Sequence, residues 1–246
     1  MLKNGPREVN LNDPYFLNLA VRQNNKELVR WLLEKGYNIN AQNETQHPPV
    51  YLASLRGFKD MVEFLIENGA EVNQKSIFGF SSIHAAVWKG ESELANILLQ
   101  NGAKVDQKLY DGSTALHSAC SQEKTEVIKT LINIGANIEA KDPIYHGWTP
   151  LHWAVVRNNM EIVLMLLENE ADLDAVDHFN DSTLHWAIQK DNCQMSELLL
   201  KCGVSLGKRN VDGNNALEYS LQKREKGIDF FKIMSFQQSK YLSGYK

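Results

Sequence analysis

The chain has 246 residues, with 26 basic and 30 acidic side chains and a formal net charge of −4. This near balance argues against a nucleic-acid-binding protein, because such proteins gather positive charge on one surface. No apolar run approaches the roughly 18 residues of a membrane span, and residues 1–6 hold no apolar core of a signal peptide. We therefore expect neither nucleic acid nor a membrane among its partners.

The predicted elements follow one another as a repeat along the chain. A short phrase that ends in alanine returns every 33 residues, apart from one interval of 35 between Ala119 and Ala154. A fixed period in this range indicates a stack of similar units, none of which can bury its apolar face alone. The alanines are Ala20, Ala53, Ala86, Ala119, Ala154 and Ala187, and Ser220 takes the seventh place.

Each unit is predicted to contain two helices, a turn between them and an extended loop. The phrase opens with Thr or Ser, which suits a helix N-cap, and Pro150 suits the first helical position. A second apolar run then follows the spacing of one helical stripe, as Val127 and Leu131 illustrate. A glycine such as Gly135 ends this second helix, because glycine tolerates the left-handed conformation of helix ends. Glu170 replaces that glycine in the fifth unit, where we expect local strain of about 1 kcal/mol.

The phrase itself points to a known family. It reads TPLHWA at residues 149–154, TALHSA at 114–119, STLHWA at 182–187 and SSIHAA at 81–86. With the 33-residue period, the chain resembles the ankyrin-repeat family, whose signature is T-P-L-H-x-A. The resemblance implies an all-α fold, an ankyrin-repeat solenoid of stacked helix–turn–helix units with extended loop fingers.

The repeat divides the chain into an N-terminal extension (1–9), an ankyrin-repeat array (10–233) and a C-terminal tail (234–246). The two terminal repeats depart from the phrase, as expected of end caps that need a polar outer face. The two extra residues of the longer interval fall within 143–147, in the finger before the fifth helix pair. The seven repeats cover residues 10–42, 43–75, 76–108, 109–143, 144–176, 177–209 and 210–233.

A column of histidines at the fourth position of the phrase could suggest a metal site. Stacked helices lie about 8–10 Å apart, whereas zinc ligands lie about 2 Å from a shared ion, so neighbouring repeats cannot share one. We interpret each imidazole as a hydrogen-bond partner of the loop backbone. The chain also has no nucleophile elbow, phosphate-binding loop or H-E-x-x-H phrase, so we expect no enzyme, cofactor or metal. The column comprises His84, His117, His152 and His185.

The three cysteines, Cys120, Cys193 and Cys202, show no paired framework of disulfides. Cys120 and Cys193 fall at helix positions that we expect to be buried, where cysteine behaves as a small apolar residue. Unpaired cysteines favour a reducing, intracellular setting. We expect a cytoplasmic protein, with the nucleus as the alternative compartment.

The resemblance implies a partner site on the concave face that the first helices and the fingers line in ankyrin arrays. The position before the phrase's alanine holds Trp153 and Trp186, which either contact a partner or pack between helices. Trp88 and Trp148 are expected to be exposed. Three residues after the alanine, five of the seven units carry Lys or Arg, and Trp, Tyr and Arg are enriched at binding hot spots. The predicted partner-binding residues are Arg56, Phe78, Phe80, Trp88, Lys89, Tyr110, Tyr145, His146, Trp148, Trp153, Arg157, Phe179, Trp186 and Lys190.

The sequence thus predicts a non-catalytic protein–protein interaction module, a monomer that acts as adaptor, scaffold or inhibitor. Its aromatic and basic columns favour a peptide segment or partner domain with acidic, phosphorylated or aromatic residues. Two alternatives stay open. The phrases at 79–84 and 149–155 are similar to the substrate-recruiting ankyrin domains of DHHC palmitoyltransferases, in which Trp153 or Trp186 would grip a substrate peptide. Ankyrin arrays also serve as secreted effectors of pathogens or symbionts that act on host proteins.

Overall fold

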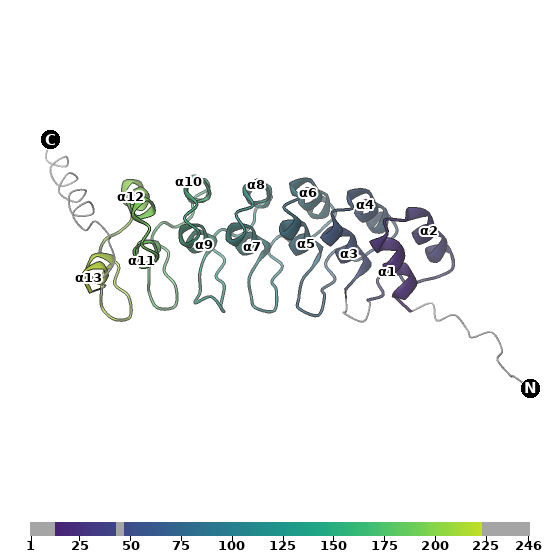
Figure 1. Cartoon of the computed structure of the whole chain (residues 1–246), viewed down its shortest axis with the longest axis horizontal. Helices are drawn as coiled ribbons and strands as arrows, with labels where there is room; N and C mark the ends of the chain where they lie inside the picture. Colours follow the sequence, from purple (N-terminus) through teal and green to yellow (C-terminus); the bar gives the residue numbers. More distant parts are fainter. Residues whose placement is uncertain (1–12, 43–46, 223–246) are drawn as a thin grey trace, which may run out of the picture. The chain divides into compact units, whose positions relative to one another are not determined.

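The structure, a computed structural model, describes residues 13–42 and 47–222, which form thirteen α-helices (Figure 1). These described ranges contain no β-strand, and three isolated bridges join residues of the loops. The predicted all-α class is therefore confirmed. The chain divides into two compact units, Met1–Tyr110 and Asp111–Lys246. The predicted extension (1–9), the tail (234–246) and the end of the seventh repeat lie outside the described residues.

Three helix pairs make up the first unit. They are α1 (Tyr15–Arg22) with α2 (Lys26–Glu34), α3 (Pro49–Arg56) with α4 (Lys59–Glu67), and α5 (Ser82–Lys89) with α6 (Ser92–Gln100). The first helix of each pair packs on its neighbours, α1 on α3 and α3 on α5, while each second helix packs on its own partner. Within this unit the apolar stripes of neighbouring pairs thus cover one another, as the repeat requires.

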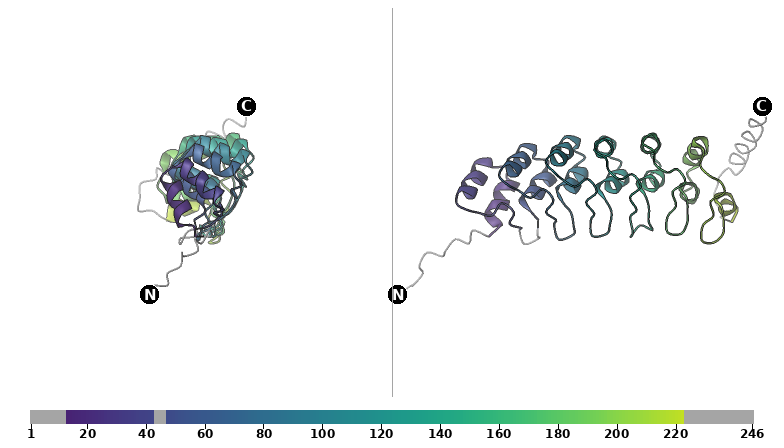
Figure 2. Two further views of the ribbon diagram at one scale, coloured as in Figure 1. Left: turned by 90° about the vertical axis from the view of Figure 1, so that its right-hand side faces the viewer. Right: turned by 180° about the vertical axis from the view of Figure 1, so that it is seen from behind.

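The second unit continues the same pattern with three further pairs and one last helix. They are α7 (Ala115–Ser121) with α8 (Thr125–Asn133), α9 (Pro150–Val156) with α10 (Met160–Glu168), α11 (Thr183–Gln189) with α12 (Cys193–Cys202), and α13 (Ala216–Gln222). Here α7 packs on α9, α9 on α11 and α11 on α13. Within this unit the loop fingers all project on the same side of the helices (Figure 2).

The helices that open the phrase begin at the predicted Thr or Ser. Thr149 has an extended backbone and caps α9, with Pro150 at the first helical position. Its backbone N–H donates to Nδ1 of His152 over 3.2 Å, and this bond completes a capping box. Local chemistry therefore fixes where these helices start. The same capping box occurs at Ser81, Thr114 and Ser182.

Apolar cores lie between the two rows of helices in each unit. Val127 and Leu131 on α8 are buried, as their spacing predicted. A fully buried side chain of this size contributes about 1.5–3 kcal/mol to folding. The alanines of the phrase are all fully buried, and their small side chains let neighbouring first helices pack closely. They are Ala20, Ala53, Ala86, Ala119, Ala154 and Ala187.

The second helices end at residues with left-handed backbone, as predicted. Gly135 after α8 has φ of 91°, and Gly203 after α12 has φ of 94°. Glu170 takes the same conformation after α10, with φ of 68°. Because a side chain at positive φ is crowded by the backbone, the strain expected from the sequence falls at this helix end.

One expectation about the cysteines is wrong. Cys120 is buried as predicted, but Cys193 is exposed. Cys193 is the first residue of α12, and this helix buries Met195 and Ser196 instead. The phrase sets the register of the first helix in each pair, whereas the second helix carries a weaker signal for its own starting position.

Candidate functional site

The histidine column holds the loops onto the helices. Nδ1 of His152 accepts from the backbone, so the other ring nitrogen carries the proton and can donate. Nε2 of His117 lies 2.9 Å from the carbonyl oxygen of Ala140, and that of His185 lies 3.1 Å from the oxygen of Asn214. Burial lowers the pKa of His152 to about 4 and also lowers the pKa of His117. The predicted bond to the loop backbone is thus confirmed at His117 and His185. Among the described residues no group of three His, Cys, Asp or Glu could hold a metal ion.

In the first unit the predicted aromatic residues are mostly exposed. Trp88 on α5 and Phe78 in the preceding finger are each 64% exposed, and Tyr110 is 70% exposed. The ammonium of Lys75 lies 5.7 Å from the ring centroid of Tyr110. Phe80 is half-buried, since its ring packs edge-on against an imidazole of the histidine column. This unit therefore presents separate aromatic side chains on its surface.

The predicted basic residues stand at the ends of the first helices. Arg56 and Lys89 are the last residues of α3 and α5, and Arg157 and Lys190 directly follow α9 and α11. All four side chains are exposed, and no carboxylate of the described residues forms an ion pair with them. A cation at a helix C-terminus is favoured by the helix dipole, which accounts for their position without any partner.

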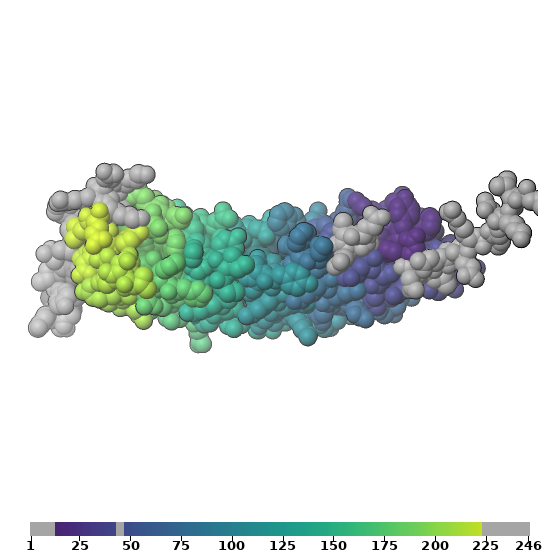
Figure 3. Space-filling view, turned by 90° about the horizontal axis from the view of Figure 1, so that it is seen from below, coloured from purple at the N-terminus to yellow at the C-terminus, as the bar shows by residue number. Residues whose placement is uncertain are grey.

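The fingers differ in length, and one of them is wider than the others. In the sixth finger the N–H of Asp177 donates to the carbonyl of Asp181, four residues on. In the fifth finger the N–H of Asp142 donates to the carbonyl of Trp148, six residues on. The two extra residues seen in the sequence therefore enlarge the tip of the fifth finger. Figure 3 shows the second unit, teal to yellow, from the side on which its fingers project.

An aspartate at the base of each of these fingers organises the turn. Oδ1 of Asp177 accepts from the backbone N–H groups of Phe179 and Asp181, at 2.8 and 2.9 Å. Its Oδ2 accepts from the indole N–H of Trp186 over 2.9 Å. This aspartate was not among the predicted binding residues. An Asp nine residues before the tryptophan of the phrase is the signal that could have revealed it.

Asp142 begins the fifth finger in the same way but does not complete the pattern. Its Oδ1 accepts from the backbone N–H groups of Ile144 and Tyr145, at 3.0 and 3.2 Å. Its Oδ2 is buried and has no hydrogen-bond partner among the described residues, and neither does the indole N–H of Trp153. Asp142 lies 11 residues before Trp153, whereas Asp177 lies nine before Trp186, so the insertion separates the pair.

Four aromatic side chains gather beside this finger, and we call them the aromatic cluster: Tyr145, Trp148, Trp153 and Trp186. Trp148 lies at its centre, with ring centroids 4.9 Å from Trp153 and 4.6 Å from Trp186, both edge to face. Tyr145 stacks edge-on against Trp153 at 4.9 Å and lies 6.4 Å from Trp148. The expectation that Trp148 is exposed is wrong: it is only 7% exposed, because the neighbouring tryptophans cover it.

The tips of the fifth and sixth fingers also touch each other. The rings of His146 and Phe179, both exposed, lie 4.9 Å apart. The backbone N–H of His178 donates to the carbonyl of His146 over 2.6 Å. Glycine is required at Gly147, which has φ of 77°, and a Cβ there would lie 2.4 Å from the ring of His178. This contact fixes the enlarged finger next to its neighbour.

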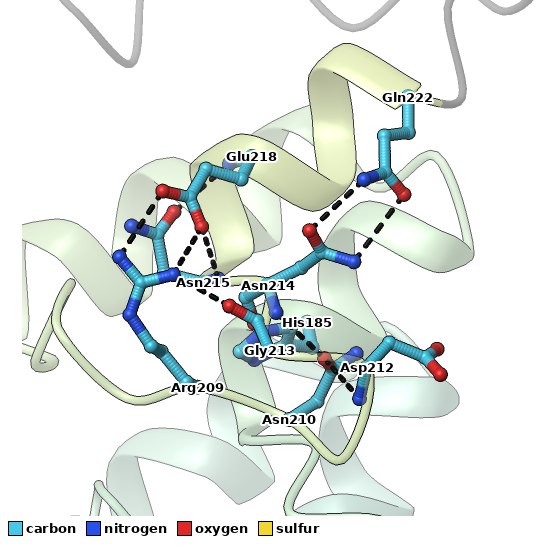
Figure 4. Close-up of polar contacts among 9 residues, drawn as sticks. All are labelled: His185, Arg209, Asn210, Asp212, Gly213, Asn214, Asn215, Glu218 and Gln222. Atoms are coloured by element: carbon cyan, nitrogen blue, oxygen red, sulfur yellow. Dashed lines mark hydrogen bonds and ion pairs between the residues drawn. The ribbon is translucent and has the colours of Figure 1, made fainter.

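The last described repeat replaces the histidine of the phrase with a glutamate (Figure 4). Glu218 accepts from the backbone N–H of Asn215, and Asn215 in turn accepts from the N–H of Glu218. Arg209 holds the same carboxylate with two bonds of 2.6 and 3.1 Å and lowers the pKa of Glu218. The departure from the phrase in this terminal repeat, expected of an end cap, is thus a second form of capping box.

Comparison with known proteins agrees with this geometry. The family model "Ankyrin repeats (3 copies)" matches residues 17–109 and again 83–177, more than half of the chain. The chain belongs to the ankyrin-repeat family. Four of its first helices, α5, α7, α9 and α11, begin with the capping box that the family's phrase T-P-L-H-x-A supplies. No curated protein matches the chain by sequence at a significant level.

Solved ankyrin structures resemble this one closely. The ankyrin repeat domain of Bcl-3, a member of the IkappaB protein family, matches with a TM-score of 0.79 and 27% identity, covering 88% of this chain and 97% of that one. The ankyrin repeat domain of human ASB11 matches with a TM-score of 0.70 and 28% identity, covering 86% and 98%. Ankyrin repeats generally serve protein–protein interaction. Among the described helices, none is both long and apolar enough to cross a membrane.

Proposed function

We propose that this ankyrin-repeat chain is a non-catalytic interaction module that binds a peptide segment or partner domain through its first helices and fingers. The observation that carries the proposal is the aromatic cluster of the second unit, in which the exposed Tyr145 and the half-buried Trp153 and Trp186 pack around the buried Trp148. Clustered Trp and Tyr side chains are typical of binding hot spots, where they supply large contact area at low entropic cost.

The two basic residues of the second unit extend this surface. Arg157 lies four residues after Trp153, and Lys190 lies four residues after Trp186, so each cation shares a helix face with a tryptophan. Because α9 and α11 pack together, the two faces adjoin. We therefore expect a partner segment in which an aromatic or apolar anchor accompanies acidic or phosphorylated residues.

The first unit offers a second, weaker contact surface. Trp88 and Lys89 end α5, and Phe78 and Tyr110 stand on fingers, all of them exposed. These side chains do not form a cluster, so we assign them a supporting contact. As a binding module without chemistry of its own, the protein acts as an adaptor, a scaffold or an inhibitor, in the cytoplasm or the nucleus and as a monomer.

The test is a binding measurement on the second unit's surface in the full chain. Partners are captured from the native cell and then purified, and their affinity is compared between the unmodified protein and two double variants. Trp153→Ala with Trp186→Ala removes the anchors, and Arg157→Glu with Lys190→Glu reverses the charges. We expect each to weaken binding by at least about tenfold, a loss of about 1.4 kcal/mol.

A matched control makes the same charge change away from this surface. Lys129 and Lys201 lie on the second helices α8 and α12, where each pairs with a glutamate of its own helix. Exposed pairs of this kind contribute about 0.3–0.5 kcal/mol, so Lys129→Glu with Lys201→Glu should leave the fold intact. If the control weakens partner binding as much as the Arg157 and Lys190 reversals, the proposed surface is wrong.

A further inference from the structure

The fingertips of the second unit expose large apolar side chains. The fifth, sixth and seventh fingers turn at residues 142–148, 177–181 and 210–214, on the face seen in Figure 3. Tight turns usually carry Gly, Pro, Asn, Asp or Ser. Single exposed apolar residues are ordinary, but a row that continues from finger to finger marks an interaction surface. We call these side chains the fingertip row: Ile144, Tyr145, Phe179 and Val211, each 45–62% exposed.

Backbone hydrogen bonds join the three tips to one another. The N–H of His178 donates to the carbonyl of His146 over 2.6 Å, and the N–H of Val211 donates to the carbonyl of Phe179 over 2.8 Å. Each finger also closes on itself through an antiparallel bridge at its base. Every finger thus contributes two backbone segments to one hydrogen-bonded row. Such segments lie about 4.8 Å apart, so equivalent tip positions recur about every 9.6 Å.

The backbone donors of the tips are already used within the protein. The N–H groups of Ile144 and Tyr145 both donate to a carboxylate of their own finger, and so does the N–H of Phe179. The N–H of Val211 is taken by the bond between fingers. A partner strand that adds to a sheet edge needs free main-chain donors. Recognition at the fingertip row therefore depends on side chains.

The spacing of the tips selects the conformation of a bound segment. A polyproline II helix has three residues per turn and returns to the same face about every 9.3 Å. An α-helix returns to nearly the same face every seven residues, or about 10.5 Å. Across two intervals between fingers, the first departs from the tips by about 0.6 Å and the second by about 1.8 Å. The polyproline II helix keeps the closer register.

The side chains of the tips also suit such a segment. Proline-rich segments dock on aromatic residues and lose little entropy, because their conformation is already formed. The rings of His146 and Phe179 lie 4.9 Å apart and bring two aromatic side chains together between the fifth and sixth tips. Proline has no N–H, so the segment presents mainly carbonyl oxygens. The hydroxyl of Tyr145 and the ring N–H of His178, both exposed, can donate to these oxygens.

We propose that the fingertip row binds a proline-rich segment of a partner protein in the polyproline II conformation. Every third residue is a proline, and successive prolines of this series lie on Tyr145, Phe179 and Val211. The segment lies across the tips and enters no cavity. This inference rests on the proposed interaction function and names a second segment by which the partner is recognised.

The test uses synthetic peptides and the full chain labelled with nitrogen-15. The probe is a nine-residue peptide of three Pro-Ala-Ser repeats, blocked at both ends. One control has the same composition with its three prolines adjacent, and a second is an alanine-rich helical peptide with leucine every seven residues. We expect NMR signals of residues 142–148, 177–181 and 210–214 to shift with the probe. Its affinity should exceed that of either control about tenfold.

A double variant removes two members of the fingertip row. Phe179→Ala with Val211→Ala should weaken binding of the probe about tenfold and leave the fold intact, because both side chains are exposed. The matched control is Ile134→Ala with Leu164→Ala. These are exposed apolar residues at the end of α8 and on α10, away from the fingers. The control should bind the probe as the unmodified protein does, and equal losses in the two double variants would overturn the proposal.

The peptides separate this proposal from the interaction function on which it rests. Equal binding of the probe and its rearranged form, or tighter binding of the helical peptide, would overturn the polyproline II segment. If the probe does not bind but Trp153→Ala with Trp186→Ala weakens the captured partner, the segment is wrong and the interaction surface stands. If the probe shifts the tips but neither the tryptophan nor the charge variants affect the partner, the surface of the first helices is wrong and the fingertip row stands.

Discussion

The fifth and sixth repeats carry the same L-H-W-A core of the phrase, yet they use it differently. In the sixth, Asp177 bonds both its finger and the indole of Trp186. In the fifth, two extra residues widen the finger, and the corresponding oxygen of Asp142 is left without a donor. The residue before the N-cap also changes, from Asp181 to the central tryptophan of the aromatic cluster. A small insertion thus separates the finger aspartate from the indole N–H that it would bind in the arrangement of the sixth repeat.

The largest expected difference between the two repeats lies in their finger aromatics. Trp148 is buried between two other tryptophans, so Trp148→Ala leaves a cavity and should lower the free energy of unfolding by about 3–5 kcal/mol. Phe179 in the sixth finger is 45% exposed, and Phe179→Ala should cost less than about 1 kcal/mol. Urea unfolding of both variants measures the difference. Equal losses would show that Trp148 is not the centre of a packed cluster.

The histidine of the fifth repeat should make stability depend on pH. Burial lowers the pKa of His152 to about 4, against 6.5 for an exposed imidazole. The unfolded chain therefore takes up a proton that the folded chain does not, and stability falls as the pH drops from about 6.5 to about 4. The shift of about 2.5 units corresponds to a total loss of about 3 kcal/mol.

Two variants separate the effect of protonating His152 from the effect of losing the hydrogen bonds of its ring. His152→Gln removes the ionisable ring, and His185→Gln makes the same change in the sixth repeat. The free energy of unfolding is measured by urea denaturation across this pH range. His152→Gln should reduce the slope of the unfolding free energy against pH, by an amount that corresponds to at most about one bound proton. A dependence as steep as that of the unmodified protein would assign the effect to other groups, such as His117, whose pKa burial also lowers.

The features that were predictable from the sequence are those set by local chemistry. The capping box at Thr149, the glycine ends of the second helices and the strained backbone of Glu170 each depend on a few neighbouring residues. The 35-residue interval likewise located the enlarged finger. The capping box recurs at four of the first helices, so one sequence pattern predicts where all four begin.

The features that were missed depend on contacts between repeats. Trp148 looked exposed because finger residues usually are, and its burial requires Trp186, which lies 38 residues away. Asp142 was not among the predicted residues, and only comparison with Asp177 shows that one of its oxygens lacks a donor among the described residues. The exposure of Cys193 was missed because the start of a second helix has no phrase to mark it.

Substitution of the two finger aspartates, Asp142 and Asp177, should give a difference in unfolding free energy of intermediate size. Asp177→Asn places an amide where Trp186 now donates to an oxygen, so two donors face each other, at a cost of about 1–3 kcal/mol. Asp142→Asn meets no such donor at Oδ2 and removes a buried charge, so its cost should stay below about 1 kcal/mol. Thermal or urea unfolding of the two variants shows which of them loses more stability. A larger loss for Asp142→Asn would mean that its second oxygen is already engaged within the protein.

The smallest expected difference lies at the ends of the second helices. Glu170 and Gly203 both follow such a helix with positive φ, of 68° and 94°, and only glycine adopts this backbone without crowding. Glu170→Gly should therefore stabilise the protein by up to about 1 kcal/mol, and Gly203→Ala should destabilise it by about the same amount. The midpoint of urea unfolding measures both. The greater chain entropy of unfolded glycine opposes the gain at Glu170, so a fall in the midpoint would mean that this entropy outweighs the relief of strain.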